Sequence, residues 1–260
     1  MTLYRHEMKR AKIALIAWSA VLGFMLGLTV LIYPQMAQQM DEVTKAFSEM
    51  GAFSSAFGMD RLNFGELTDY FVVECGNVLG LGGAVFAAIA GAAALAKEER
   101  EHTAEFLCAH PVSRTRIAVS KLAAVGTQIV ILNAAVAAVT ALCIAVIGER
   151  ADAGVIALSF LAYLILQFEI AAIGFAVSAF AVRGSMGIGI GVAFGLYFFN
   201  ILSNITEDVE FLKYITPFAL ADGAEIKEAG HLSGPYLAVT LVVTVVAAVI
   251  GVLYFRQKDL

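Results

Sequence analysis

The sequence of 260 residues is 60% hydrophobic and only 15% charged, with a formal net charge of −5 and a mean hydropathy of +0.82. These values differ strongly from those of an ordinary soluble domain, and they exclude a protein whose mass lies mainly in water. Six apolar runs are long enough to cross a hydrocarbon core of about 30 Å as helices. They cover residues 13–33, 71–96, 117–147, 155–182, 186–203 and 236–255. The runs are continuous rather than alternating, which predicts an all-α polytopic membrane protein with a single transmembrane domain over residues 1–260.

A basic segment, residues 3–12, precedes the first run, and we expect it to form an amphipathic helix along the inner membrane face. A signal peptide is the alternative, but an apolar run of about 21 residues is too long for a signal core and no small-residue cleavage site follows it. We therefore expect a retained first helix. Twelve of the 17 Lys and Arg residues lie in segments that face inward if the N-terminus is cytosolic. The positive-inside rule thus predicts that both termini are cytosolic.

Two segments that would face outward are more apolar than simple linkers. In residues 34–69, apolar side chains recur every three or four positions, as on one face of a helix. These are Met36, Met40, Val43, Phe47 and Met50. Residues 204–235 mix charged with apolar side chains. We expect both segments to pack against the bundle, and a role in gating the substrate is the alternative.

Glycine spacing indicates close helix contacts. Gly76 and Gly80 are four residues apart in the second run, and Gly187, Gly191 and Gly195 repeat this spacing in the fifth. Small residues at such intervals allow helix backbones to approach each other in a membrane.

Residues 97–121, KEEREHTAEFLCAHPVSRTRIAVSK, form a charged interruption between the second and third runs. We expect Pro111 to end a short helix over residues 97–110, because proline cannot continue a helix and restricts the residue before it. Ser113 is then well placed to cap the helix of the third run. An ordinary solvated loop is the alternative.

Glu169 lies near the middle of the fourth run, where insertion scales give a charge a cost of about 2.5–3.5 kcal/mol. It must therefore be protonated, paired, or facing a polar cavity. We hypothesise a substrate cleft lined by Glu169, Asn77, Asn133 and Asn200. The alternative is a carboxyl group that only bonds neighbouring helices and has no role in transport.

No catalytic or metal-binding pattern occurs in the sequence. A phosphate-binding G-x-x-x-x-G-K-[ST] loop is absent, so the chain is not itself a P-loop ATPase. His6-Glu7 begins like a zinc motif but lacks its second histidine. Cys75, Cys108 and Cys143 are isolated, so neither a disulfide framework nor a metal site is predicted. We expect no catalytic residue, no metal and no cofactor bound by this chain.

The charged interruption resembles the signature of ABC-2 family permease subunits. In that family an acidic residue precedes a Gly-Thr pair, a second acidic residue, a leucine pair, Pro-x-Ser-Arg and a lysine. The corresponding residues here are Glu99, His102-Thr103, Glu105, Phe106-Leu107, Pro111-Val112-Ser113-Arg114 and Lys121. The sequence departs from the pattern at His102 and Phe106. The basic N-terminus, Thr216-Pro217-Phe218 and the C-terminal residues 255–260 extend the resemblance over nearly the whole chain.

The resemblance implies the permease of an ATP-driven exporter that contains two permeases and two separate ATP-binding subunits. ATP and Mg²⁺ would be bound by those partners, and the substrate would pass through a cleft at the permease dimer interface. The charged interruption would be the coupling helix that docks on the ATPase. Its expected partner-binding residues are Glu98, Glu99, Thr103, Glu105, Phe106, Leu107, Pro111, Ser113 and Arg114. We expect a multi-pass protein of a bacterial plasma membrane, with no nucleic-acid partner.

Two other functions remain open at this point. An ion-coupled secondary transporter would use Glu169 for coupling, although such proteins often contain inverted repeats and none is evident here. A non-transporting membrane scaffold or immunity protein would need neither a docking loop nor a polar cleft.

Overall fold

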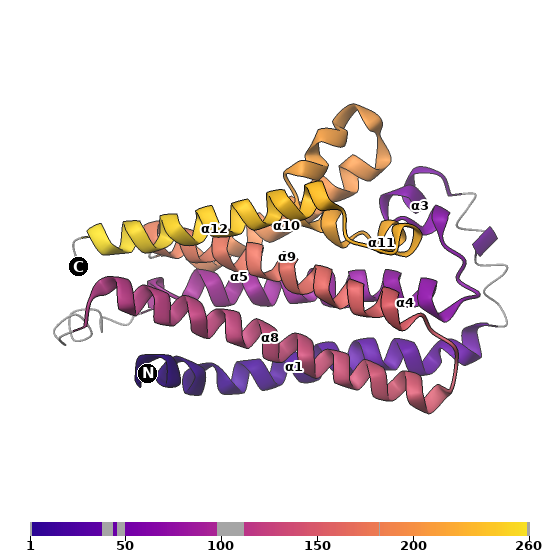
Figure 1. Cartoon of the computed structure of the whole chain (residues 1–260), viewed down its shortest axis with the longest axis horizontal. Coiled ribbons are helices and arrows are strands. Elements are labelled where there is room, and N and C mark those ends of the chain that lie inside the picture. The colour runs from indigo at the N-terminus through magenta and orange to yellow at the C-terminus, as the bar shows by residue number, and fades with distance from the viewer. Residues whose placement is uncertain (1, 38–43, 46–49, 98–111, 182, 259–260) are drawn as a thin grey trace.

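The computed structural model describes residues 2–37, 44–45, 50–97, 112–181 and 183–258, and every regular element in this part of the chain is a helix (Figure 1). Six helical stretches are long and apolar enough to cross a membrane. They are α1 (Thr2–Met36), the joined elements α4 (Leu67–Cys75), η3 (Gly76–Gly82) and α5 (Gly83–Ala93), then α8 (Arg114–Ile147), α9 (Ala153–Phe180), α10 (Ser185–Ile205) and α12 (Gly234–Gln257). The expected all-α fold with six spanning helices is confirmed.

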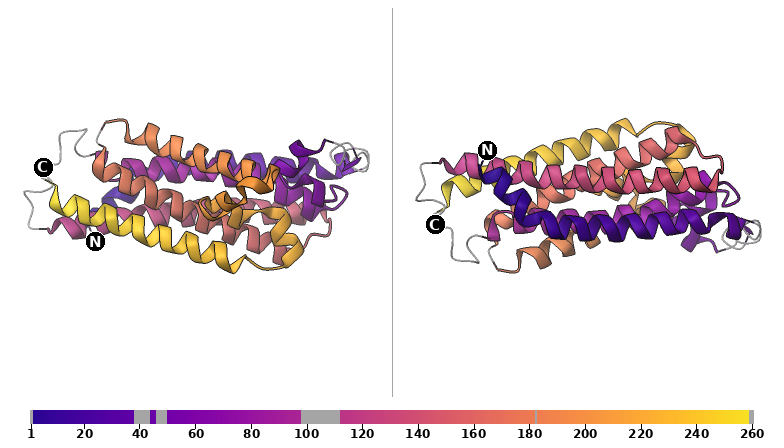
Figure 2. Two further views of the ribbon diagram at one scale, coloured as in Figure 1. Left: turned by 90° about the horizontal axis from the view of Figure 1, so that it is seen from above. Right: turned by 90° about the horizontal axis from the view of Figure 1, so that it is seen from below.

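The spanning helices run side by side, and both termini lie at one end of the bundle (Figures 1 and 2). We call this the inner end and the opposite end the outer end, following the charge distribution. Helix α9 is central, since it contacts α5, α8, α10 and α12, while α1 packs mainly along α8. The side chains of Leu166, Ile170 and Phe175 on α9 are at most 1% exposed. A movement of α5, α8, α10 or α12 would therefore displace side chains that pack against α9.

Short helices cover the outer end of the bundle. After α1 come α3 (Ala52–Ala56) and η2 (Met59–Arg61), and between α10 and α12 lie η4 (Glu207–Tyr214), η5 (Pro217–Ala221) and α11 (Gly223–Ala229). Phe64 and Phe218 are buried, so these parts of the two segments pack on the bundle as expected. Phe211 is instead 60% exposed. Met40, Val43 and Phe47 of the predicted apolar stripe lie outside the described residues.

The ends of the central helices follow from local capping. Ser113 precedes α8, and its Oγ accepts a hydrogen bond of 3.3 Å from the amide of Arg116, which confirms the predicted cap. At the other end, Gly148 adopts φ 69°, a conformation that favours glycine and stops the helix. Asp152 then caps α9 through Oδ1, which accepts hydrogen bonds from the amides of Gly154 and Val155.

The basic N-terminal segment is the start of α1 rather than a separate helix. Its first turns are inclined to the rest of α1 (Figure 2, right). Arg5, Lys9 and Lys12 are exposed, whereas Tyr4 and Glu7 are half-buried on the face turned toward α8. The expected amphipathic character is therefore present, within one continuous helix.

The second span differs from an uninterrupted helix, because η3 is a π-helix over Gly76–Gly82. Tyr163 of α9 packs against this segment: a Cβ placed on Gly80 would lie 2.9 Å from Tyr163 Cε1. The span also begins earlier than the hydropathy indicated, at Leu67 rather than residue 71. The close aromatic contact depends on the absence of a side chain at Gly80.

Close glycine contacts occur between the second span and α9, but not at the predicted glycines of α10. A Cβ on Gly91 of α5 would overlap the carbonyl oxygen of Ala171, and one on Gly174 of α9 would lie 3.0 Å from the carbonyl oxygen of Ala88. The backbones of the second span and α9 thus approach closely at Gly91 and Gly174, whereas the predicted Gly76 and Gly80 face the side chain of Tyr163. Along α10 the glycines that repeat every fourth residue are open: a Cβ added to any of them would meet no atom of the described part of the chain within 4 Å. These residues are Gly187, Gly191 and Gly195.

Candidate functional site

The four residues predicted to line a substrate cleft lie in three separate places. Asn77 of η3 and Asn200 of α10 line one pocket near the outer end. Asn133 of α8 lies in the middle of the bundle and is hydrogen bonded to α9. Glu169 of α9 faces α12. The structure therefore brings two of the four together within this chain.

The outer pocket, as we call the cavity shared by Asn77 and Asn200, has a volume of about 70 Å³. Besides these two asparagines, its polar lining comes from α9, α10 and the start of α11. These residues are Tyr163, Tyr197, Asn204 and Asp222. The Oδ1 atom of Asn200 is buried and has no hydrogen-bond partner in the described part of the chain. The pocket thus offers an unused acceptor among hydroxyl and amide groups, which suits a ligand that donates hydrogen bonds.

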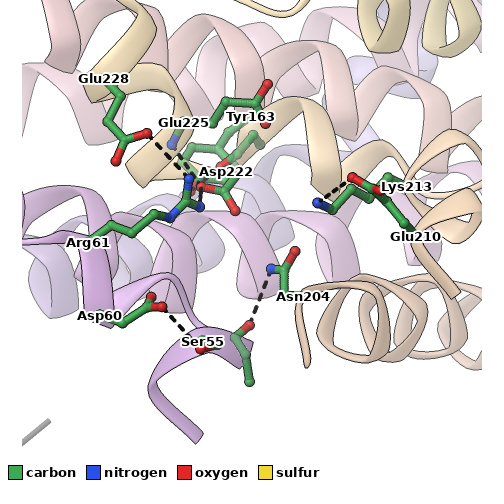
Figure 3. Close-up of polar contacts among 12 residues, drawn as sticks. Ser55, Asp60, Arg61, Tyr163, Asn204, Glu210, Lys213, Asp222, Glu225 and Glu228 are labelled. Carbon is green, nitrogen blue, oxygen red and sulfur yellow. Dashed lines mark hydrogen bonds and ion pairs between the residues drawn. The ribbon is translucent and has the colours of Figure 1, made fainter. Parts of the chain in front are cut away.

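Two hydrogen bonds fix the walls of the outer pocket. The Tyr163 hydroxyl donates to the carbonyl oxygen of Ala221 at 3.1 Å, which ties α9 to the turn before α11. Asn204 Nδ2 donates to the carbonyl oxygen of Ala56 at 3.4 Å, which ties α10 to α3 (Figure 3). Sequence reasoning missed Tyr163 and Asn204, because their partners are backbone carbonyls on distant segments.

Ion pairs close the rim above this pocket. Arg61 of η2 lies 3.4 Å from Asp222 and 3.5 Å from Glu228, so it links the first outer segment to α11 (Figure 3). Lys227 of α11 pairs with Asp69 and, at 3.2 Å, with Glu66. The Arg61 pairs therefore hold α11 against η2, and the Lys227 pairs hold it against the start of α4.

The clamp also affects the titration of α11. Partial burial of Lys227 disfavours its charged form, but hydrogen bonds to Asp69 and Glu66 outweigh this and raise its pKa. Burial, with the nearby charge of Asp222 adding to it, raises the pKa of Glu225. The rim is therefore an electrostatically coupled surface.

A buried amide network crosses the middle of the bundle. Asn133 Nδ2 donates to Gln167 Oε1 at 2.7 Å, and Gln167 Nε2 donates to the carbonyl oxygen of Leu79 in η3 at 3.4 Å. Gln167 is fully buried and Asn133 is 6% exposed. The network joins α8, α9 and the π-helix, so a change at η3 is linked to both neighbouring spans.

Glu169 occupies a different face of α9 from Gln167. Its carboxyl lies beside the Thr240 side chain of α12, and its Oε2 atom is buried without a partner in the described residues. The residue is only 2% exposed. Both hypotheses for Glu169, a transport role and a purely interhelical bond, remain open at this geometry.

At the inner end, the start of α8 is tied to two other spans. Arg114 Nη1 donates to the carbonyl oxygen of Lys258, and Lys258 Nζ donates to the carbonyl oxygen of Ala179 at 3.1 Å. Ser113 and Arg114 are the two predicted partner-binding residues that the structure describes. The others lie outside the described residues: Glu98, Glu99, Thr103, Glu105, Phe106, Leu107 and Pro111. Among the described residues, no group of three or more His, Cys, Asp or Glu could hold a metal ion.

The comparisons with known proteins agree with this architecture. The whole chain, residues 1–260, matches a family model described as "ABC-2 family transporter protein". A search of curated proteins finds no match.

Proposed function

The chain belongs to the ABC-2 family of transporter proteins, and we propose that it is the permease of a bacterial plasma-membrane exporter driven by two separate ATP-binding subunits. In this proposal ATP and Mg²⁺ bind to the partners, and this chain contributes the membrane path. Two permeases, identical or homologous, enclose the substrate cleft at their interface. The chain performs no catalysis itself.

The observation that supports coupling best is the junction where the charged segment re-enters the bundle. Ser113 caps α8, and Arg114 links the start of α8 to Lys258 at the end of α12, which in turn bonds to the end of α9. A displacement of the charged segment would therefore move three spans together rather than bend one loop.

The other end of the charged segment also leads to α9. Residue 97 follows α5, and α5 packs on α9 through the close contact between Gly91 and Ala171. An ATPase that binds the segment more tightly in one nucleotide state would thus bias the arrangement of α5, α8 and α9. Such differential binding is the way in which ATP can drive a conformational change in a permease.

The exposed face of α10 supports the proposal that this chain pairs with a second permease. A Cβ on Gly187, Gly191 or Gly195 would meet no atom of the described residues within 4 Å, although small residues at this spacing favour close helix contact. Phe194 and Phe198 on the same helix are also exposed. We propose that α10 contributes to the permease interface and that Asn77 and Asn200 contact substrate near its outer end.

The coupling proposal is tested by substituting Leu107 with aspartate. We expect Leu107→Asp to abolish binding of the ATP-binding subunit, measured by co-purification, and to abolish ATP-linked transport, because a charge cannot replace an apolar anchor in a partner pocket. Val112→Asp is the matched control, since Val112 is exposed and outside the predicted anchor. Full partner binding and transport in Leu107→Asp would refute the coupling role.

Ion coupling through Glu169 is kept as a second candidate, because its buried Oε2 lacks a partner among the described residues. A carboxyl group in this position is typical of proton-coupled transporters. Transport that persists without any ATPase and is lost in Glu169→Gln would favour this candidate over an ATP-driven permease.

A further inference from the structure

A carboxylate, Glu74, lies within the membrane part of the second span. It belongs to α4 and follows Leu67, the first residue of that helix, by seven positions, or about 10 Å of helix. The whole span has 27 residues and is therefore about 40 Å long. Centred on a hydrocarbon core of about 30 Å, it would extend about 5 Å beyond each surface. Glu74 is then about 5 Å inside the core, at its outer side.

Glu74 has no ion pair and no hydrogen bond with any residue that the structure describes. The other carboxylate of this span, Asp69, is paired with Lys227. The neighbouring helices offer no cation at this depth, because residues 13–36 of α1 and all of α9 and α10 contain no Lys, Arg or His. The charge of Glu74 is therefore not balanced by the helices that pack on the second span.

The Glu74 side chain reaches the surface of the chain rather than its core. Glu74 is partly exposed, and Asn77, three residues further along the span, is exposed. Gly80 marks a different side of the span, since it faces Tyr163 of α9. A carboxylate that faces lipid inside the hydrocarbon core is costly, and carboxylates at such positions commonly line the path of a substrate or ion.

The surroundings of Glu74 favour an organic cation. Asn77 also lines the outer pocket, whose lining includes the carboxylate of Asp222 but no Lys, Arg or His. The Oδ1 atom of Asn200 in that pocket is an unused acceptor among the described residues. A metal ion needs several oxygen ligands, and the described residues contain no group of three or more His, Cys, Asp or Glu that could hold one. One carboxylate is enough to pair with an ammonium or phosphonium group.

We propose that Glu74 binds the cationic group of the transported substrate, which is an organic cation, and that Asn77 contacts the same molecule. The inference rests on the proposed function, because it assigns this surface of the permease to substrate. Pairing with Glu74 offsets part of the cost of taking the cation out of water. Glu74 thus selects cations over anions of the same size and shape.

The experiment compares tetraphenylphosphonium with tetraphenylborate, two ions of nearly the same size and of opposite charge. Binding of each ion to the full chain in phosphatidylcholine nanodiscs is measured by equilibrium dialysis, and binding to empty nanodiscs is subtracted. We expect Glu74→Gln to weaken tetraphenylphosphonium binding about tenfold and not to weaken tetraphenylborate binding, because it removes the charge and keeps the shape of the side chain. Glu74→Asp keeps the charge and should bind within about threefold of the parent protein. Glu149→Gln is the matched control, because Glu149 is an exposed carboxylate beyond the end of α8.

Thermal unfolding separates substrate recognition from a structural role. Since Glu74 has no partner among the described residues, Glu74→Gln should keep or raise the unfolding temperature. A fall would show that the carboxylate stabilises the fold through another group, and this would overturn the proposal.

Two binding results would also overturn it. The first is an equal loss of tetraphenylphosphonium binding in Glu74→Gln and Glu149→Gln, or no loss in Glu74→Gln. The second is displacement of tetraphenylphosphonium by millimolar sodium at constant ionic strength, which would identify an inorganic cation as the ligand. These measurements need no ATPase. Transport of a substrate by the complete transporter without selection of cations by Glu74 would therefore refute this site alone, whereas selective binding without any ATP-linked transport would refute the proposed function.

Discussion

The contact between α5 and α9 gives the sharpest prediction, the substitution Gly91→Ala. The added methyl group would overlap the carbonyl oxygen of Ala171, so the helices must separate by about 1 Å to restore an ordinary contact distance. Because the opposing atoms are backbone, no side-chain rotation can relieve the overlap. We expect the free energy of unfolding to fall by an amount toward the upper end of the range of about 1–3 kcal/mol that overpacking costs. For a chain of this size, each kcal/mol corresponds to about 2–4 °C in the unfolding temperature.

Gly187→Ala is the control for this substitution, because a methyl group at Gly187 would meet no described atom within 4 Å. Alanine there should be neutral or gain up to about 1 kcal/mol from helix propensity. The measurement is thermal unfolding of both variants in the same detergent, followed by ATP-linked transport. If Gly91→Ala unfolds at the temperature of Gly187→Ala, the close packing of α5 on α9 is not a determinant of stability. Our account of how movement reaches α9 would then be wrong.

Two further predictions concern polar contacts. Asn133→Leu and Gln167→Leu should each lower the free energy of unfolding by about 1–3 kcal/mol, because each leaves a buried amide without its partner. The double variant should lose less stability than the sum of the two single variants. Additive losses in thermal unfolding would show that the pair is not coupled. The raised pKa of Lys227 predicts that its pairs with Glu66 and Asp69 stabilise the fold fully below its ordinary value of 10.5 and that this stabilisation is lost as the pH rises through the higher folded value. The difference in unfolding temperature between the parent protein and Lys227→Met should therefore shrink above pH 10.5, and a constant difference up to pH 12 would contradict this.

Hydropathy and charge were sufficient to predict the helical class and the spans, because a bilayer imposes a minimum apolar length on each helix. The start of the second span was missed for a specific reason. Asp69 lies inside the helical stretch, and its charge lowers the local hydropathy. Its partner is Lys227, which lies far away in sequence and comes close only after α11 folds over the outer end.

The membership of the candidate cleft also depends on contacts between distant segments. Polar residues within spans are conspicuous in a sequence, and Asn77, Asn133, Asn200 and Glu169 were chosen on that basis. Which of them share a cavity depends on the rotation of each helix about its axis, and that is set by packing. Tyr163, whose hydroxyl reaches a backbone carbonyl beside the outer pocket, carries no signal that distinguishes it from an ordinary membrane aromatic residue.

The π-helix at Gly76–Gly82 has a consequence for the phase of the whole second span. One wide turn accommodates an additional residue, and each residue of an α-helix advances the side-chain direction by about 100°. Deleting one glycine of this segment (Gly76, Gly80 or Gly82) and restoring a regular α-helix would rotate the residues before it relative to α5. Asp69 would then point away from Lys227, and the ion pair that holds α11 against α4 would break without any change to a charged residue.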